Sequence, residues 1–181
     1  MPDINRLPGS RIVAIARLAF ADPDVDFLCF GESDQPSPGV AREAVLAAID
    51  SGLTKYVDVR GVPALREALA AYLTALHAKP VAEGRIQVTA SGMAALNLAL
   101  AATVRPGERV PGERLIVHTP AWPNGANAAR LHGAEILTLP LTPLPDGRFR
   151  LDLDRLASLL PGARAFILNS PNNPTGWTAT R

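Results

Sequence analysis

The stretch that decides the fold is Ser170-Pro171-Asn172-Asn173-Pro174-Thr175-Gly176-Trp177, which directly follows the apolar run Ala165-Phe166-Ile167-Leu168. Four consecutive apolar residues next to turn-forming residues are typical of a buried strand. The two prolines then direct the backbone out of the sheet as an extended turn. An ordinary surface turn is the plain alternative, because Asn, Pro and Gly are common turn residues. The pattern predicts that Asn172 and Asn173 lie at the carboxyl end of a strand, the edge of an open α/β sheet at which ligands bind.

Strands and helices alternate through the second half of the chain. Strands are predicted at 85–89, 115–119, 134–139 and 165–168, and helices after residue 90, at 125–132 and at 152–160. This alternation predicts an α/β fold with a mainly parallel sheet and helices on both faces. The first half contains predicted helices at 11–20, 38–51 and 62–78, with Ser10 as a helix cap, and a short strand at 25–30. The motif PGER occurs at 106–109 and again at 111–114, which predicts a surface loop.

Composition excludes several classes of function. The chain has 18 Lys and Arg residues against 17 Asp and Glu residues, a net charge of +1, and no basic run. Nothing therefore indicates a nucleic acid or an anionic membrane as partner. Cys29 is the only cysteine, so neither an intrachain disulfide nor a thiol metal cluster is expected, and the three histidines have no metal-ligand spacing. The sequence shows no export signal and no apolar run of membrane-spanning length, so we expect a cytoplasmic protein acting on small molecules.

A candidate phosphate site lies at Ser91-Gly92-Met93, between a predicted strand and the helix that follows it. A helix start offers free backbone N–H groups and the positive end of the helix dipole, both of which suit a phosphate. Ser91 can add its hydroxyl, Gly92 allows a close approach, and Met93 supplies an amide. The plain alternative is an ordinary serine helix cap.

Three further segments carry candidate site residues. Gly31 begins the loop Gly-Glu-Ser-Asp-Gln-Pro-Ser-Pro, Tyr56 begins the pattern Y-x-x-x-x-G-x-x-x-L-R, and Trp122 lies in Pro120-Ala121-Trp122-Pro123-Asn124 after a predicted strand. Each has a plain alternative: a proline-rich loop, a tyrosine half-buried at a helix entrance, and a tryptophan of the core.

Taken together, the five segments occur in the order found in the class I/II aminotransferases, and the chain resembles that family from about residue 31 to residue 176. These are fold-type-I enzymes that use pyridoxal 5'-phosphate (PLP). The resemblance implies that Asn173 donates a hydrogen bond to the phenolic oxygen of the PLP ring. It implies that Ser91, Gly92 and the Met93 amide hold the phosphate, and that the Trp122 ring stacks on the pyridine ring.

The resemblance also implies a homodimer and a substrate site. The Tyr56 hydroxyl is expected to reach the PLP phosphate of the other subunit. Substrate is expected near the backbone at Gly31 and near Trp122 and Asn173. The loop that begins at Gly31 departs from the family pattern, with Ser and Gln where Pro and Phe are usual.

The family fold places residues 1–38 in the amino-terminal segment of a small domain and residues 39–181 in the first part of the PLP-binding large domain. The activity that the resemblance implies is transfer of an amino group between an amino acid and a 2-oxo acid. In the family, the Schiff-base lysine lies beyond the segment that contains Asn173, and neither Lys55 nor Lys79 matches it. We therefore expect the amino-terminal half of an aminotransferase, inactive alone. The alternatives are a PLP-dependent lyase or synthase of the same fold, and a non-catalytic binding domain.

Overall fold

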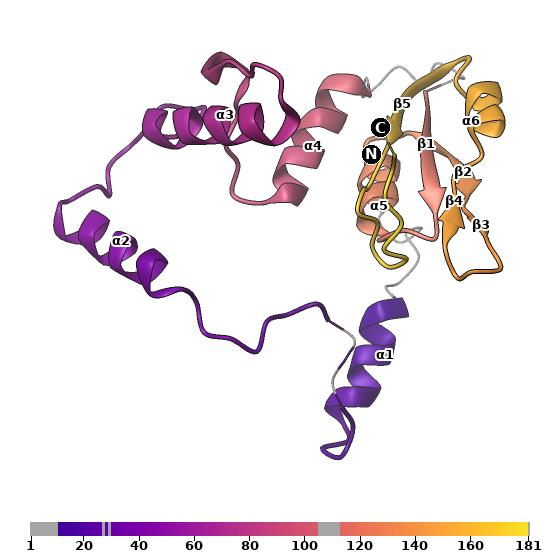
Figure 1. Cartoon of the computed structure of the whole chain (residues 1–181), viewed down its shortest axis with the longest axis horizontal. Coiled ribbons are helices and arrows are strands. Elements are labelled where there is room, and N and C mark those ends of the chain that lie inside the picture. The colour runs from indigo at the N-terminus through magenta and orange to yellow at the C-terminus, as the bar shows by residue number, and fades with distance from the viewer. Residues whose placement is uncertain (1–10, 27, 29, 105–112, 181) are drawn as a thin grey trace. The chain divides into compact units, whose positions relative to one another are not determined.

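A computed structural model describes residues 11–26, 28, 30–104 and 113–180 (Figure 1). The chain forms two compact units, one within Pro8–Gln87 and one within Val88–Arg181. We describe each unit by itself. Their border does not coincide with the predicted domain border at 38/39, which remains a prediction.

The second unit contains a parallel sheet of three strands in the order β2-β1-β5. They are β1 (Arg114–Thr119), β2 (Glu135–Pro140) and β5 (Ala163–Ile167). The four inner residues of the central strand β1 are all buried, as expected for a strand of a parallel sheet that is covered on both faces. The strands predicted at 115–119, 134–139 and 165–168 are confirmed.

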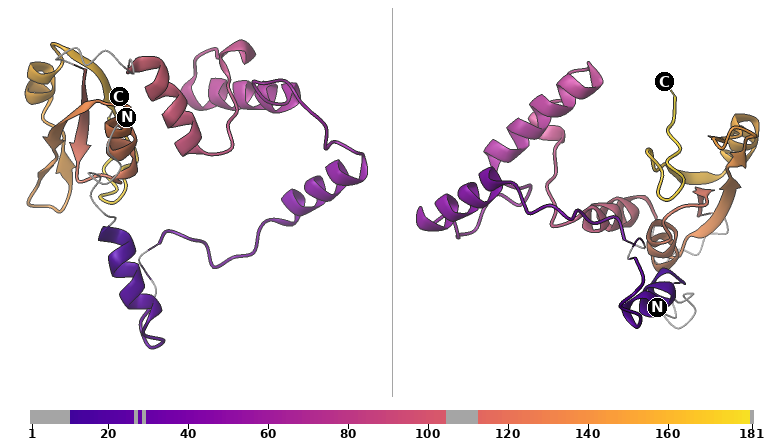
Figure 2. Two further views of the ribbon diagram at one scale, coloured as in Figure 1. Left: turned by 180° about the vertical axis from the view of Figure 1, so that it is seen from behind. Right: turned by 60° about the horizontal axis from the view of Figure 1, so that its bottom comes forward.

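Helices cover the two faces of this sheet. Helix α5 (Asn124–Leu131) joins β1 to β2, and α6 (Leu153–Leu159) leads into β5. Because β2 and β5 lie on opposite sides of β1, two right-handed crossovers place α5 and α6 on opposite faces, as Figures 1 and 2 show. Helix α4 (Gly92–Thr103) packs beside α5. The buried core between these elements consists of Leu100, Val104, Leu115, Ala128, Ala129 and Ala134.

A small hairpin was not predicted. Strands β3 (Thr142–Pro143) and β4 (Phe149–Arg150) pair antiparallel around a turn that contains Gly147. Gly147 has a φ of +80° and donates its N–H to the Leu144 oxygen at 3.0 Å, so the turn uses the left-handed conformation that glycine tolerates. Strands of two residues are too short to show a pattern in the sequence.

The first unit contains three α-helices in its described residues and one short 3-10 helix. They are α1 (Arg11–Phe20), α2 (Gly39–Asp50), α3 (Pro63–His77) and η2 (Glu83–Arg85). The helices predicted at 11–20, 38–51 and 62–78 are confirmed to within one residue, whereas Ser10 and residues 105–112 of the PGER segment lie outside the described residues. None of the described helices is long and apolar enough to cross a lipid bilayer.

The strand predicted at 85–89 is wrong, because residue 85 belongs to η2 and residues 86–89 are not part of a strand. The strand predicted at 25–30 stays a prediction: residues 27 and 29, including Cys29, lie outside the described residues, and the described ones form bends and irregular backbone. A strand requires a neighbouring strand that completes its hydrogen-bond ladder, so apolar composition alone does not make one.

Candidate cofactor site

Two loops meet at the carboxyl ends of β1 and β5. We call residues 120–123 the tryptophan loop and residues 168–177 the asparagine loop. The two parallel strands are neighbours, with Val117 opposite Ile167, so their carboxyl ends lie side by side. The Trp122 N–H donates to the backbone oxygen of Asn173 at 2.8 Å, and Asn172 Nδ2 donates to the Pro120 oxygen at 3.0 Å. The predicted position of Asn172 and Asn173 is confirmed.

The two adjacent asparagines play different parts. Asn172 is only 4% exposed, and its Nδ2 also donates to Thr175 Oγ1 at 2.7 Å. Its backbone N–H donates to the Trp177 oxygen, and its backbone oxygen accepts from Gly176, both at 2.8 Å. Asn173, by contrast, has an exposed side chain with no hydrogen bond to the described residues. Asn172 therefore builds the asparagine loop, while the amide of Asn173 is available to a ligand.

Trp122 is not a core residue. Its side chain is 41% exposed, and its backbone N–H is already used by the bond to Asn173. The alternative of a buried tryptophan after the strand is therefore wrong. An exposed indole at the edge of the sheet offers a flat apolar face on which an aromatic ligand can stack.

Helix α4 begins at Gly92 with Ser91 as its cap. Ser91 is extended (φ −163°, ψ 162°), and its Oγ accepts the Ala94 N–H at 3.1 Å. Ser91 is thus confirmed as a helix cap, and its O–H can still donate a hydrogen bond to a ligand. The N–H groups of Gly92 and Met93 have no hydrogen bond to the described residues, as usual in the first turn of a helix. A Cβ at Gly92 would meet no heavy atom within 4 Å. This helix start therefore fits an anion.

The core fixes the start of α4. A Cβ added at Gly125 of α5 would lie 3.7 Å from Leu96 of α4 and 3.8 Å from Ile167 of β5. Helix α5 therefore packs closely against both elements at this glycine. His132 Nε2 lies 3.2 Å from Asn97 Oδ1, which links α5 to α4. The helix that carries the candidate phosphate groups is thereby attached to the same core as the two loops.

Sequence reasoning missed His118. This residue of β1 is fully buried. Its Nε2 accepts a hydrogen bond from the backbone N–H of Asn169, with 3.0 Å between the two nitrogens. Burial lowers the pKa of His118 below its ordinary 6.5. The only signal in the sequence was a histidine inside an otherwise apolar strand.

Tyr56 and Gly31 belong to the other unit, so the structure does not bring them together with Ser91, Trp122 and Asn173. Tyr56 is fully exposed in the segment before α3, which makes the alternative of a half-buried tyrosine wrong. Gly31 is exposed, and a Cβ there would meet no atom of the described residues within 4 Å.

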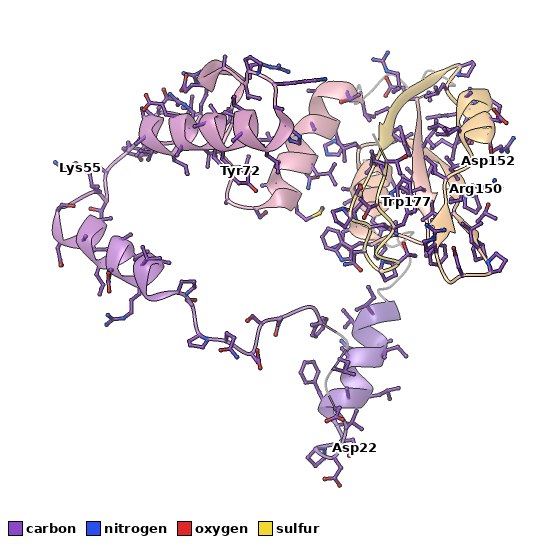
Figure 3. The ribbon with its side chains drawn as sticks, viewed as in Figure 1. Asp22, Lys55, Tyr72, Arg150, Asp152 and Trp177 are labelled. Carbon is purple, nitrogen blue, oxygen red and sulfur yellow. The ribbon has the colours of Figure 1, made fainter. Side chains whose placement is uncertain are left out.

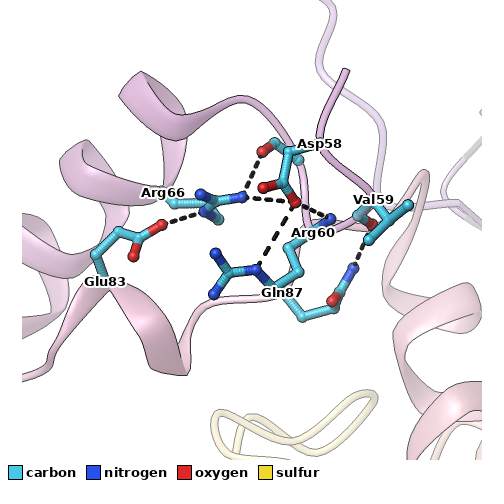
Figure 4. A network of polar contacts seen from close by, with 7 residues as sticks. Asp58, Val59, Arg60, Arg66, Glu83 and Gln87 are labelled. Carbon is cyan, nitrogen blue, oxygen red and sulfur yellow. Dashed lines mark hydrogen bonds and ion pairs between the residues drawn. The ribbon is translucent and has the colours of Figure 1, made fainter. Parts of the chain in front are cut away.

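A buried arginine holds the segment that follows Tyr56 (Figure 4). The Arg66 side chain is 4% exposed, and its Nη1 lies 2.7 Å from the Gly61 oxygen and 3.1 Å from Asp58 Oδ1. Its Nε pairs with Glu83 of η2. The Arg60 N–H first, and the Arg66 guanidinium next, lower the pKa of Asp58 below its ordinary 3.8. Several apolar side chains of α3 are exposed, among them Leu65, Tyr72 (Figure 3) and Leu76.

Comparison with known proteins agrees with this geometry. Residues 24–181 match the family described as Aminotransferase class I and II. The chain belongs to this family. The predicted family and the predicted fold type I, with its parallel sheet, are thereby confirmed. This family uses PLP as its cofactor.

Relatives of this aminotransferase family member are considerably longer than it is. An aspartate/prephenate aminotransferase of Cereibacter sphaeroides is 32% identical in sequence, and the alignment covers 98% of this chain and 44% of the relative. A mutant aspartate aminotransferase of Thermus thermophilus superposes with a TM-score of 0.83 at 31% identity, covering 97% of this chain and 45% of that structure. An Escherichia coli protein with a methionine aminotransferase function gives a TM-score of 0.86 at 28% identity, covering 100% and 46%. The chain thus spans less than half the length of these relatives.

Proposed function

We propose that this chain forms the PLP-binding part of an aminotransferase that transfers an amino group between an amino acid and a 2-oxo acid. The observation that carries the proposal is the position of Asn173. Its exposed amide is held beside the exposed indole of Trp122 by a backbone hydrogen bond of 2.8 Å. The relatives described above are aminotransferases, which supports the same reaction class.

The start of α4 would hold the phosphate of PLP. The free N–H groups of Gly92 and Met93 and the O–H of Ser91 are three donors at the positive end of a helix dipole. The open space above Gly92 allows the anion to approach the backbone. These donors fix the position of the cofactor and carry out no proton transfer.

The two loops would hold the ring. The Trp122 indole would stack on the ring, and Asn173 Nδ2 would donate to its phenolic oxygen, which would favour the ionised form of that oxygen. When bound, PLP supplies an electron-withdrawing ring that weakens the bonds at the substrate α-carbon. Asn172 takes no direct part, because its amide is already bonded within the asparagine loop.

The residues of the first unit would complete the site in a homodimer. Tyr56 projects its whole side chain into solvent, which suits a residue that reaches the PLP phosphate of a second subunit. The backbone at Gly31, together with Trp122 and Asn173, would lie near the substrate carboxylate. The relatives act on different amino acids, as their names indicate, so the proposal specifies only the class of substrate.

PLP binding to the purified chain tests the proposal. We expect equilibrium dialysis to show reversible binding, and Asn173→Ala to weaken it by about tenfold, the cost of one hydrogen bond to a charged group. Asn127→Ala is the matched control, because Asn127 lies on α5 and its side chain accepts a hydrogen bond from Arg130, outside the two loops; its affinity should equal that of the native chain. Equal binding by all three proteins, or no binding by any, contradicts the proposed role.

The unit that carries Asn173 contains no lysine, since Lys55 and Lys79 both belong to the other unit. This observation favours the alternative of a non-catalytic binding domain for the chain on its own. We expect the isolated chain to bind PLP without transferring amino groups. Borohydride reduction followed by mass analysis should leave no PLP attached. Covalent labelling of either lysine, with production of a 2-oxo acid from an amino acid, would contradict this expectation.

A further inference from the structure

His118 contacts the asparagine loop at both of its ends. Its Nε2 accepts the N–H of Asn169, near the start of the loop, at 3.0 Å. Its ring centroid lies 5.5 Å from that of Trp177, the last residue of the loop. On the side of β5, Phe166 meets the ring edge-on with centroids 6.2 Å apart. A single buried side chain of β1 thus holds the loop that carries Asn173.

The contact with Asn169 determines the protonation state of the ring. A backbone N–H can only donate, so Nε2 must be unprotonated and the proton of the neutral ring must lie on Nδ1. Nδ1 is buried and has no hydrogen-bond partner among the described residues. The groups that face the ring are the two aromatic rings and the Asn169 amide; no described acidic or basic side chain pairs with it.

Protonation would change this arrangement. A proton on Nε2 would set one N–H against another, so the hydrogen bond to Asn169 would be lost. It would also place an uncompensated charge in a fully buried position, which is unfavourable. Both effects are relieved when the asparagine loop moves away from β1 and water reaches the ring.

We propose that His118 is a positioning residue: its unprotonated Nε2 fixes the asparagine loop against β1, and protonation of the ring releases the loop and lowers the affinity for PLP. The first part is a statement about the chain alone. The second part rests on the proposed function, because it requires that the loop binds PLP.

Fluorescence of Trp177 tests the first part without PLP. The chain has two tryptophans, so Trp122→Phe leaves Trp177 as the only reporter, and a protonated imidazole quenches an adjacent indole. We expect one fluorescence step below pH 6.5, the ordinary pKa of histidine, because burial lowers the pKa of His118. His118→Gln in the same background should abolish the step, because the Gln oxygen can replace Nε2 as acceptor and does not titrate there. His132→Gln should leave it unchanged.

Far-UV circular dichroism over the same pH range identifies general unfolding. A step that persists in His118→Gln, or one that coincides with loss of helix signal, overturns the proposal. So does a native chain that shows no step before it unfolds.

PLP affinity tests the second part. Between pH 7.5 and the acid end of the fluorescence step, the native chain should lose about three- to tenfold more affinity than His118→Gln, the size of one net hydrogen bond. This comparison cancels the titration of the PLP phosphate itself. His118→Leu should bind weakly at both pH values. Equal pH dependence in the native and Gln chains overturns the link to PLP, whereas a total absence of PLP binding with the fluorescence step intact contradicts the proposed function and leaves the loop contact standing.

Discussion

The backbone N–H of Trp122 donates to the backbone oxygen of Asn173 at 2.8 Å, and this bond joins two loops that are far apart in the sequence. Because only main-chain atoms take part, both side chains remain available. Substitution of either side chain therefore preserves the bond itself. Effects on ligand binding can for this reason be separated from effects on folding.

Truncation to Ala should lower the stability of the chain at Asn172 but hardly change it at Asn173. Asn172→Ala removes the bonds to Pro120 and Thr175 and leaves buried groups unsatisfied, so we expect it to lower the free energy of unfolding by about 1–3 kcal/mol. Asn173→Ala should change it by less than about 0.5 kcal/mol, because this side chain is exposed. Urea unfolding followed by tryptophan fluorescence measures both. Equal losses would show that Asn173 also supports the loop.

Substitutions of Ser91 can distinguish its role as a helix cap from its proposed role in phosphate binding. Ser91→Ala should lower the free energy of unfolding by about 1 kcal/mol, because the Oγ that accepts the Ala94 N–H is lost. Ser91→Asp should retain stability, since Asp caps helices as well as Ser does. Its negative charge, however, would repel a phosphate at the helix start. We expect Ser91→Asp to abolish PLP binding in dialysis, and binding at the native level would place the phosphate elsewhere.

Replacement of Gly92 by Ala should not destabilise the fold. A Cβ there meets no protein atom within 4 Å, and Ala favours a helix by up to about 1 kcal/mol over Gly. Gly92→Ala is therefore expected to retain or raise the melting temperature. The added methyl would occupy the space proposed for the phosphate, so PLP affinity should fall. An unchanged affinity would show that no ligand uses this space.

The carboxyl-end loops could be predicted because an apolar strand is followed directly by turn-forming residues both at 115–124 and at 165–177. The sequence could not show that Asn172 holds the asparagine loop together, since this depends on which amide reaches Pro120 at the end of the neighbouring strand. It also missed His118, whose importance depends on Asn169 of a neighbouring strand end. Contacts between segments distant in the sequence leave no local pattern.

The errors in the first unit have a similar origin. In α3 a charged residue, Arg66, is buried together with Ala70, whereas the apolar Leu65 is exposed. Residues 85–89 have the composition of a strand, yet residue 85 belongs to η2 and residues 86–89 are not part of a strand. Composition indicates a preference, and the neighbouring segment decides whether it is realised.

The last prediction concerns Arg66, the buried centre of the network in Figure 4. Arg66→Met leaves Asp58 and Glu83 without their buried partner and frees the Gly61 oxygen. We expect faster hydrogen exchange of residues 56–66 and lower stability in urea, measured by circular dichroism at pH 7. Arg60→Met is the control: its Nε lies 3.7 Å from Asp58 Oδ1 and its side chain is 42% exposed, so its effect should be small.

Acid should reduce the difference between Arg66→Met and the native chain. The pKa of Asp58 is lowered in the folded state, so its contribution to stability is present above the ordinary value of 3.8 and is lost as the pH falls below it. The loss continues until the pH falls through the lowered pKa, where Asp58 takes up a proton and Arg66 loses the charge with which it pairs, so the variant loses less relative to the native chain. The gap in urea midpoint should accordingly be smaller at pH 3 than at pH 7. A gap that is equal at both values would mean that Arg66 stabilises this unit through its bond to Gly61 and its packing, and not through the ion pair with Asp58.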